Sequence, residues 1–283
     1  MVIRRRSFRS RWRLGTMAVL ASASPAPGPR ALPPIVSSIA PRVLSLVVVL
    51  AAWELYGRAN AIFLSYPSAI AAAFVARLVP DIIPAFGHTG EAFALGFAML
   101  LPLGIAIGMA MGRSRTIDTI LGPYVNAFYV TPRVTLIPLL VLWLGIAFQM
   151  QVAIVVLAGI FPVIVTVYAG ARIVDRDLVE VGQTFVASRA QIFRTIILPG
   201  TIPYIFTGAR LGLARALGGV ISAEMTVSIT GVGRLLISKA QFLKMDELFA
   251  PLIVLGLASI ALTSTLLWMQ RRLTPWATGL RSR

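Results

Sequence analysis

Long apolar stretches alternate with short polar segments along most of the chain. About 20 consecutive apolar residues are needed to cross a hydrocarbon layer about 30 Å thick, so stretches of this length indicate membrane-spanning helices. By this criterion the sequence predicts an all-α, polytopic membrane helical bundle with about six transmembrane helices. The predicted spans are Val43–Tyr56 extended by residues 35–39, Ala92–Met111, Leu121–Ile146, Val152–Ala171, Ile202–Ala223 and Pro251–Trp268. The third is interrupted by Pro132 and Pro138, so we expect a broken helix there.

The composition supports this interpretation. Of the 283 residues, 58% are hydrophobic and 13% are charged, and the mean hydropathy is +0.86. A soluble globular domain typically has about 45–50% apolar and about 25% charged residues, so a soluble enzyme and a disordered protein both fit poorly. The chain has no cysteine and a single histidine, His88. It therefore offers no thiolate nucleophile and no ligand set for zinc, and we predict no catalytic residue and no metal site.

The charge is strongly basic, with 26 Lys and Arg against 10 Asp and Glu and a formal net charge of +16. In a soluble protein this balance would suggest nucleic acid, but in a membrane protein it reports topology, because cytoplasmic loops are enriched in Lys and Arg. Eighteen of the 26 basic residues lie before the first predicted span, or after the second, fourth or sixth, and five lie on the opposite side. The sequence therefore predicts that both termini are cytoplasmic, and it gives no reason to expect a nucleic-acid partner.

We expect three regions along the chain. Residues 1–41 form a basic, Pro-rich cytoplasmic arm and linker, residues 42–270 form the membrane domain, and residues 271–283 form a cytoplasmic tail. The arm contains Arg5-Arg6-Ser7-Phe8, which resembles a twin-arginine export signal. The apolar run that follows is short for such a signal, so a basic arm of a multispan protein is the favoured interpretation.

Arg133, Arg210 and Arg215 fall inside predicted spans. Charges at membrane depth are costly and are often functional. Arg133 follows Pro132 in the broken third span, where free carbonyls and a water-lined path are expected. Pro132, Arg133, Pro138 and Arg210 are therefore candidates for a translocation pathway. The alternative is that these arginines extend to the cytoplasmic interface.

Small residues four positions apart mark one face of two predicted spans. They are Gly104, Gly108 and Gly112 in the second span and Gly208, Gly212 and Ala216 in the fifth. Such faces allow another helix to approach closely, so we expect these two spans to be inner helices of the bundle.

The loop at residues 172–199, between the fourth and fifth spans, is longer than a membrane hairpin needs. Asp177 and Glu180 fit the start of one helix, and Ser188 with Gln191 forms a Ser-x-x-Gln capping box at the start of another. Apolar residues follow at helical spacing in both segments, and Leu198-Pro199 ends the second. Two short capped helices favour a docking surface for a cytoplasmic partner over a simple connector.

Sequence motifs continue on both sides of this loop, in an ordered series from Leu64 to Trp268. They include Glu180-Val181-Gly182, Ala187-Ser188-Arg189, Ile197-Leu198-Pro199, Met111-Gly112-Arg113-Ser114, Trp143-Leu144-Gly145-Ile146, Ala223-Glu224-Met225 and Gly231-Val232-Gly233. Together they resemble the motifs of binding-protein-dependent ABC importer permeases, specifically those of the nitrate, sulfonate and taurine type.

The resemblance implies a permease subunit in the bacterial inner membrane that works as a homodimer with cytoplasmic ABC ATPase subunits and an extracytoplasmic solute-binding protein. It implies no cofactor in this chain, because ATP and Mg²⁺ would bind to the ATPase. The solute would be small and anionic or polar, such as a sulfonate, nitrate, taurine or a vitamin precursor. The Arg234–Leu248 segment would face the binding protein, or alternatively lie on the bilayer surface. The residues expected to couple to the ATPase are Asp177, Glu180, Gly182, Phe185, Ala187, Ser188, Arg189, Gln191, Phe193, Leu198 and Pro199.

The chain departs from the family pattern at the centre of the loop, where Val186 stands in place of glycine. Glycine would allow a left-handed turn between the coupling helices, and a β-branched residue tolerates that conformation poorly. We therefore expect either that the turn is built differently, for example shifted to Ala187, or that coupling is weakened.

The chain also lacks a phosphate-binding loop, because its only lysines, Lys239 and Lys244, do not follow glycine. ATP hydrolysis would therefore fall to another polypeptide. The alternative function is an ion-coupled secondary transporter, which predicts carboxylates within the membrane. Glu54, Glu91 and Glu224 lie near span ends instead, which disfavours that alternative.

Overall fold

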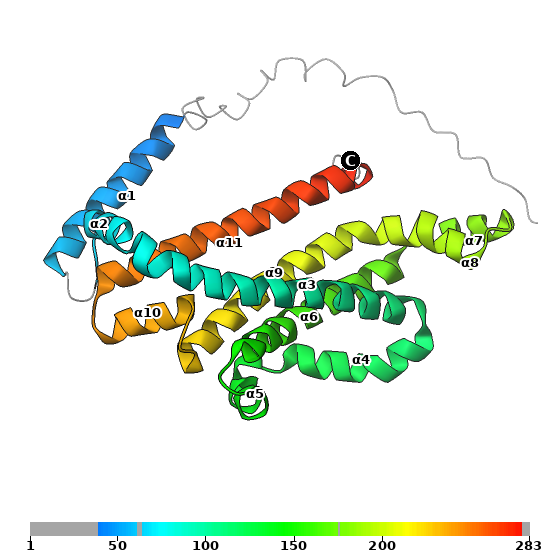
Figure 1. Ribbon diagram of the computed structural model, residues 1–283. Coiled ribbons are helices and arrows are strands. Elements are labelled where there is room, and N and C mark those ends of the chain that lie inside the picture. Colours follow the sequence, from blue (N-terminus) through cyan, green and yellow to red (C-terminus); the bar gives the residue numbers. More distant parts are fainter. Residues whose placement is uncertain (1–38, 61–63, 175, 279–283) are drawn as a thin grey trace, which may run out of the picture. The chain divides into compact units, whose positions relative to one another are not determined.

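The computed structural model describes residues 39–60, 64–174 and 176–278, and all regular elements in these residues are helical (Figure 1). The chain divides into two compact units, residues 1–49 and residues 50–283. Helix α1 (Ile39–Ala59) begins in the first unit and ends in the second. The all-α class predicted from the sequence is confirmed for the described residues.

Long helices joined by short connections make up the second unit. Its elements after α1 are α2 (Pro67–Arg77), η2 (Leu78–Ile82), α3 (Ile83–Arg113), α4 (Arg115–Val130), η3 (Arg133–Leu136), α5 (Ile137–Leu144), α6 (Phe148–Ile173), α7 (Arg176–Thr184), α8 (Arg189–Ile192), η4 (Phe193–Ile197), α9 (Leu198–Val227), α10 (Val232–Gln241), α11 (Met245–Leu273) and α12 (Pro275–Thr278).

Four segments of the described residues are long and apolar enough to cross a membrane, namely Pro67–Arg113, Phe148–Ile173, Arg189–Val227 and Met245–Leu273. They contain the second, fourth, fifth and sixth predicted spans. Helices α4 and α5 are long and apolar enough to cross a membrane only when they are taken together. The pair is bent by 95° and coincides with the interrupted third span. The described residues therefore hold up to five candidate spans, whereas the sequence predicted about six.

The difference lies in the first predicted span, Val43–Tyr56. This segment is helical, as part of α1, but it is not among the candidate spans of the described residues. Arg42, Glu54 and Arg58 lie within α1, so the stretch without charge is short. The extension predicted from residue 35 falls mostly outside the described residues, and the sixth span stays a prediction.

Helix α6 is the centre of the unit, with α3 packed along one side and α9 along another (Figure 1). The core between them includes Leu100 from α3, Val155 and Val163 from α6, and Leu213 and Val220 from α9, all of them buried. Lipid tails are as apolar as these side chains, so close packing must hold the three helices together in a membrane.

The predicted small-residue faces are contact faces, and both of them meet α6. A Cβ atom added at Gly108 of α3 would lie 2.7 Å from the carbonyl oxygen of Ile164. A Cβ atom added at Gly212 of α9 would lie 2.9 Å from the carbonyl oxygen of Gly159. Glycine at these positions therefore allows the helix backbones to touch.

The bend between α4 and α5 follows from Pro132. A residue before proline is kept out of the helical region, and Thr131 accordingly has φ −62° and ψ 130°. The Thr131 amide and hydroxyl both donate to the Ala127 carbonyl, at 3.1 and 2.8 Å, and so complete the end of α4. Pro138 lies in the first turn of α5, where a missing amide hydrogen removes no helical bond. One proline therefore breaks the span, and the other begins its second half.

We predict that Gly108→Ala lowers the midpoint of thermal unfolding of the purified protein, because the added Cβ meets the Ile164 carbonyl. Gly90→Ala on the same helix is the matched control, since a Cβ there meets no atom within 4 Å. The control should hold or raise the midpoint, because alanine favours a helix over glycine by about 1 kcal/mol. Equal midpoints for the two variants would contradict this packing.

Candidate coupling surface and membrane-embedded charges

The connection between α6 and α9 folds into two short helices, as its sequence predicts. Asp177 lies in the first turn of α7. At the start of α8, the Ser188 hydroxyl oxygen accepts a hydrogen bond from the Gln191 amide at 3.3 Å, and the Gln191 side-chain oxygen accepts one from the Ser188 amide at 2.7 Å. This reciprocal pair is a capping box, so that prediction is confirmed.

The turn between α7 and α8 is formed at Val186, which has a φ of 56°. The Ala187 amide donates to the Gly182 carbonyl at 3.1 Å, and the Val186 amide donates to the Gln183 carbonyl at 2.8 Å. These two bonds make the Schellman arrangement that ends many helices, with valine at the position that glycine usually occupies. The turn is therefore not shifted to Ala187. A left-handed conformation costs an L-residue about 1–2 kcal/mol, and the two hydrogen bonds oppose that cost.

Apolar side chains project from this turn. Phe185 is 81% exposed and Val186 is 90% exposed. Behind them α7 lies close to α8, since a Cβ at Gly182 would lie 3.3 Å from Cγ1 of Ile192. We call α7, α8 and the turn between them the hairpin.

The residues expected to couple to an ATPase fall into two groups in this part of the structure. The exposed ones are Asp177, Glu180, Phe185, Ser188, Arg189, Gln191 and Phe193, and the partly buried ones are Gly182, Ala187, Leu198 and Pro199. The first group forms the surface, and the second lies beneath it.

Arg133 lies at the bend of the broken span, in η3. Its Nη2 donates to the Tyr129 carbonyl at 2.7 Å, and its guanidinium lies 5.8 Å from the centre of the Tyr129 ring. Its Nε is buried and has no hydrogen-bond partner among the described residues, and the same holds for the Nε of Arg210 on α9. The structure thus places Pro132, Arg133 and Pro138 in succession at the bend, and it places Arg210 on a different helix.

A buried carboxylate that sequence reasoning did not propose as a site lies near the other end of α9. Glu224 is fully buried and accepts hydrogen bonds from the Thr89 hydroxyl and the Gly233 amide, each at 2.9 Å. The Thr89 hydroxyl in turn accepts a hydrogen bond from the Val232 amide at 2.9 Å. Glu224 therefore caps the first turn of α10 and joins α3, α9 and α10.

The same carboxylate explains the Gly231-Val232-Gly233 motif. Gly231 has a φ of 97°, and a Cβ there would lie 2.3 Å from the Glu224 carboxyl carbon. The glycine makes room for the buried side chain. The available sequence signal was a glutamate in an apolar helix followed by Gly-x-Gly in the next connection.

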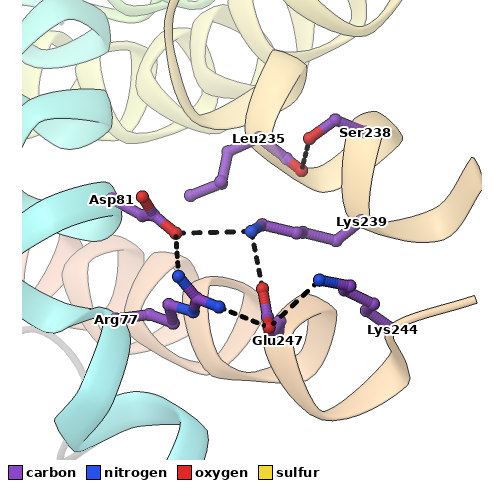
Figure 2. Close-up of polar contacts among 7 residues, drawn as sticks. All are labelled: Arg77, Asp81, Leu235, Ser238, Lys239, Lys244 and Glu247. Atoms are coloured by element: carbon purple, nitrogen blue, oxygen red, sulfur yellow. Dashed lines mark hydrogen bonds and ion pairs between the residues drawn. The ribbon is translucent and has the colours of Figure 1, made fainter. Parts of the chain in front are cut away.

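Figure 2 shows a cluster of charged side chains that fastens α10 to its neighbours. Lys239 donates to Glu247 at 2.6 Å and to Asp81 at 3.3 Å, and Arg77 donates to Glu247 at 2.9 Å. Arg77 also lies 3.8 Å from Asp81, and Lys244 lies 3.7 Å from Glu247. Burial alone would lower the pKa of the Lys239 ammonium, but hydrogen bonds to Glu247 and Asp81 and their negative charges outweigh it, so the pKa is raised. The cluster joins α10 to α2, η2 and α11.

The fold of the described residues has a counterpart in a solved structure of an ABC transporter. A solved structure of the MetNI methionine ABC transporter in an inward-facing conformation has a similar fold, with a TM-score of 0.54. The two chains are 19% identical, and the similarity covers 70% of this chain and 96% of that one.

Residues 100–279 match the family of binding-protein-dependent transport system inner membrane components. The match covers more than half of the chain, so the chain belongs to this family, the inner-membrane permeases of ABC importers.

Individual relatives agree with this assignment. The taurine transport system permease protein TauC of Escherichia coli K12 is 36% identical over 180 residues, which are 64% of this chain and 65% of TauC, slightly less than two thirds of that relative. The protein named "Probable ABC transporter permease protein BMEII0107" of Brucella melitensis is 28% identical over 239 residues, which are 83% of this chain and 96% of the relative.

We predict that Val186→Gly stabilises the turn of the hairpin, because glycine adopts a φ of 56° without the steric cost. The protection of the residue 186 and 187 amides against hydrogen exchange should rise severalfold, because the relieved steric cost of about 1–2 kcal/mol exceeds the roughly 0.5–1 kcal/mol that the added freedom of glycine in the open chain costs. Ala187→Gly is the control and should lower that protection, because Ala187 does not have a positive φ and glycine adds entropy to the open chain. Lower protection in Val186→Gly than in the unmodified chain would refute this description of the turn.

Proposed function

We propose that two copies of this chain form the translocation pathway of an ABC importer for a small anionic or polar solute. In this proposal, separate cytoplasmic ATPase subunits drive transport, and an extracytoplasmic binding protein delivers the solute. The observation that carries the proposal is the hairpin, with exposed apolar side chains on a hydrogen-bonded turn. The proposal has four parts, which concern the ATPase, the coupling, the topology and the solute.

The hairpin is the surface on which an ATPase subunit would dock. Phe185 and Val186 project from the turn, Leu178 and Val181 of α7 are exposed as well, and exposed apolar groups with polar residues around them mark sites of protein association. The capping box and the Schellman bonds hold the turn before any partner binds, which reduces the entropy lost on docking. The chain has no phosphate-binding loop, so the ATP would bind to the partner.

Coupling requires that a movement of the hairpin reach the membrane spans. The hairpin connects α6 directly to η4 and α9, and α6 packs against both α3 and α9. An ATPase that binds the hairpin differently before and after ATP binding would therefore favour different arrangements of these spans. Leu198 and Pro199, at the start of α9, lie where the hairpin joins the span.

The topology of the proposal follows from the positive charges. We place both termini and the hairpin in the cytoplasm, because most Lys and Arg residues lie on that side of the predicted spans. The connection that holds α10 is then extracytoplasmic and available to a solute-binding protein. Glu224 and the charged cluster in Figure 2 hold α10 against its neighbouring helices. A delivery partner would therefore meet a rigid surface.

The solute class is proposed from the relatives, because TauC is named as a taurine permease and taurine carries a sulfonate. The pathway residues are Pro132, Arg133, Pro138 and Arg210. At two of these positions, Arg133 and Arg210, the guanidinium has a buried Nε without an acceptor, which suits the passage of an anion.

Co-purification with the cognate ATPase subunit tests the proposal. We expect Phe185→Asp to weaken the complex by at least about 30-fold, the change for an interface residue worth about 2 kcal/mol, because a charge replaces an apolar contact. The matched control is Trp276→Asp in α12, an aromatic residue that is 53% exposed and lies outside the hairpin, and it should leave the complex intact. Full recovery of the ATPase with Phe185→Asp would contradict the docking surface, as would equal losses for both variants.

A further inference from the structure

We infer that Arg133 and Arg215 together form an anion-binding site within the membrane region, and that the site takes the sulfonate or a comparable oxyanion group of a small solute. The inference rests on the proposed function, because it takes the bend between α4 and α5 to border the translocation pathway. It adds Arg215 to the pathway and assigns the chemistry that the pathway recognises.

The packing of η3 against α9 brings the two arginines near each other. Arg133 belongs to η3 and Arg215 to α9, these two elements are in contact, and the charge of Arg215 acts on the Arg133 guanidinium. Two positive charges in a medium of low dielectric repel each other strongly. A stable pair of this kind calls for a negative partner.

No carboxylate in the described part of the chain supplies that partner. The ion pairs found there involve Arg58, Arg77, Arg172, Lys239 and Lys244, and neither Arg133 nor Arg215 takes part in any of them. Other arginines of the described residues, such as Arg113 and Arg271, are also absent from these ion pairs, so Arg133 differs from them in having a buried Nε without an acceptor and a neighbouring charge of the same sign.

Arg133 also has hydrogen-bond donors that the described residues leave without acceptors. One terminal nitrogen, Nη2, donates to the Tyr129 carbonyl, while Nε is buried and unpartnered. A buried charged donor without an acceptor costs free energy. An oxyanion on this guanidinium would supply the missing acceptor and would reduce the repulsion from Arg215 at the same time.

Arg215 is accessible to such an anion, and Arg210 belongs to a different face. The Arg215 side chain is exposed on α9, on the face that also carries the exposed Leu211 and Gly218. Arg210 lies five positions before Arg215, which is about 140° around an α-helix with 3.6 residues per turn. The two side chains therefore leave the helix in different directions, and Arg210 is not part of this site.

Two guanidinium groups suit a transported oxyanion. Each presents donors in a fixed planar fork that matches two oxygens of a sulfonate. One monovalent anion would leave one positive charge uncompensated, so the site attracts an anion from either side of the membrane.

Thermal unfolding of the full chain in lipid nanodiscs tests the inference. The probe is sodium methanesulfonate, and the reference is sodium gluconate at the same ionic strength. Methanesulfonate should raise the midpoint in a saturable manner, because a ligand that binds the folded state stabilises it. Arg133→Gln and Arg215→Gln should each weaken the apparent affinity by at least about tenfold, the loss expected for one charged hydrogen-bond partner. Arg271→Gln, an exposed arginine at the end of α11, is the matched control and should respond as the unmodified chain does.

The inference is overturned if methanesulfonate does not shift the midpoint of the unmodified chain, or if both Gln variants respond as that chain does. Should the Gln variants fail to fold, phenylglyoxal modification of the unmodified chain decides the matter by mass spectrometry. Methanesulfonate should slow modification of Arg133 and Arg215 and leave that of Arg271 unchanged, and equal rates with and without the probe would refute the site. The assay needs no ATP and no ATPase, so its failure is distinct from a failure of the proposed function.

Discussion

The contact of α3 and α9 with the backbone of α6 is the constraint on which the other features depend. Gly108 and Gly212 place these helices against the carbonyl groups of α6, where no larger residue fits. Because lipid offers no hydrophobic force that drives helices together, such close packing has to hold them in place. The hairpin follows α6 and precedes α9, and α10 follows the far end of α9, so the hairpin and α10 are attached to the same packed block (Figure 1).

Polar groups on this block fall into two kinds. Glu224 is buried but receives hydrogen bonds from Thr89 and Gly233, and the charges around Lys239 are paired with one another, so these groups serve the framework. Arg133 is placed differently, since one of its donors is buried without a partner in the described residues and its charged neighbour has the same sign. A satisfied polar group stabilises the fold, whereas the unsatisfied Nε at the break between α4 and α5 is the observation from which we propose a ligand site.

What the sequence could predict was local. Three predicted features depend only on residues that are close together in the sequence, and the structure contains all three. They are the capping box at Ser188, the break at Pro132 and the small-residue faces. The partners of those faces and of Glu224 could not be predicted, because Thr89 is 135 positions away from that carboxylate and Glu247 is 170 positions from Arg77. The expectation that the turn is shifted from Val186 to Ala187 was wrong for another reason. It weighed one residue's preference, whereas two backbone hydrogen bonds hold the left-handed turn in place.

The most direct test of the account is cross-linking from a single cysteine to the ATPase, because the chain has no cysteine of its own. Phe185→Cys, in the turn of the hairpin, carries a thiol-to-amine cross-linker of short reach, and Phe242→Cys, just after α10, is the control. The account predicts a cross-linked product containing the ATPase from position 185 and none from position 242. A product from position 242 alone, or equal yields from both positions, would contradict the claim that the hairpin is where the ATPase drives this permease.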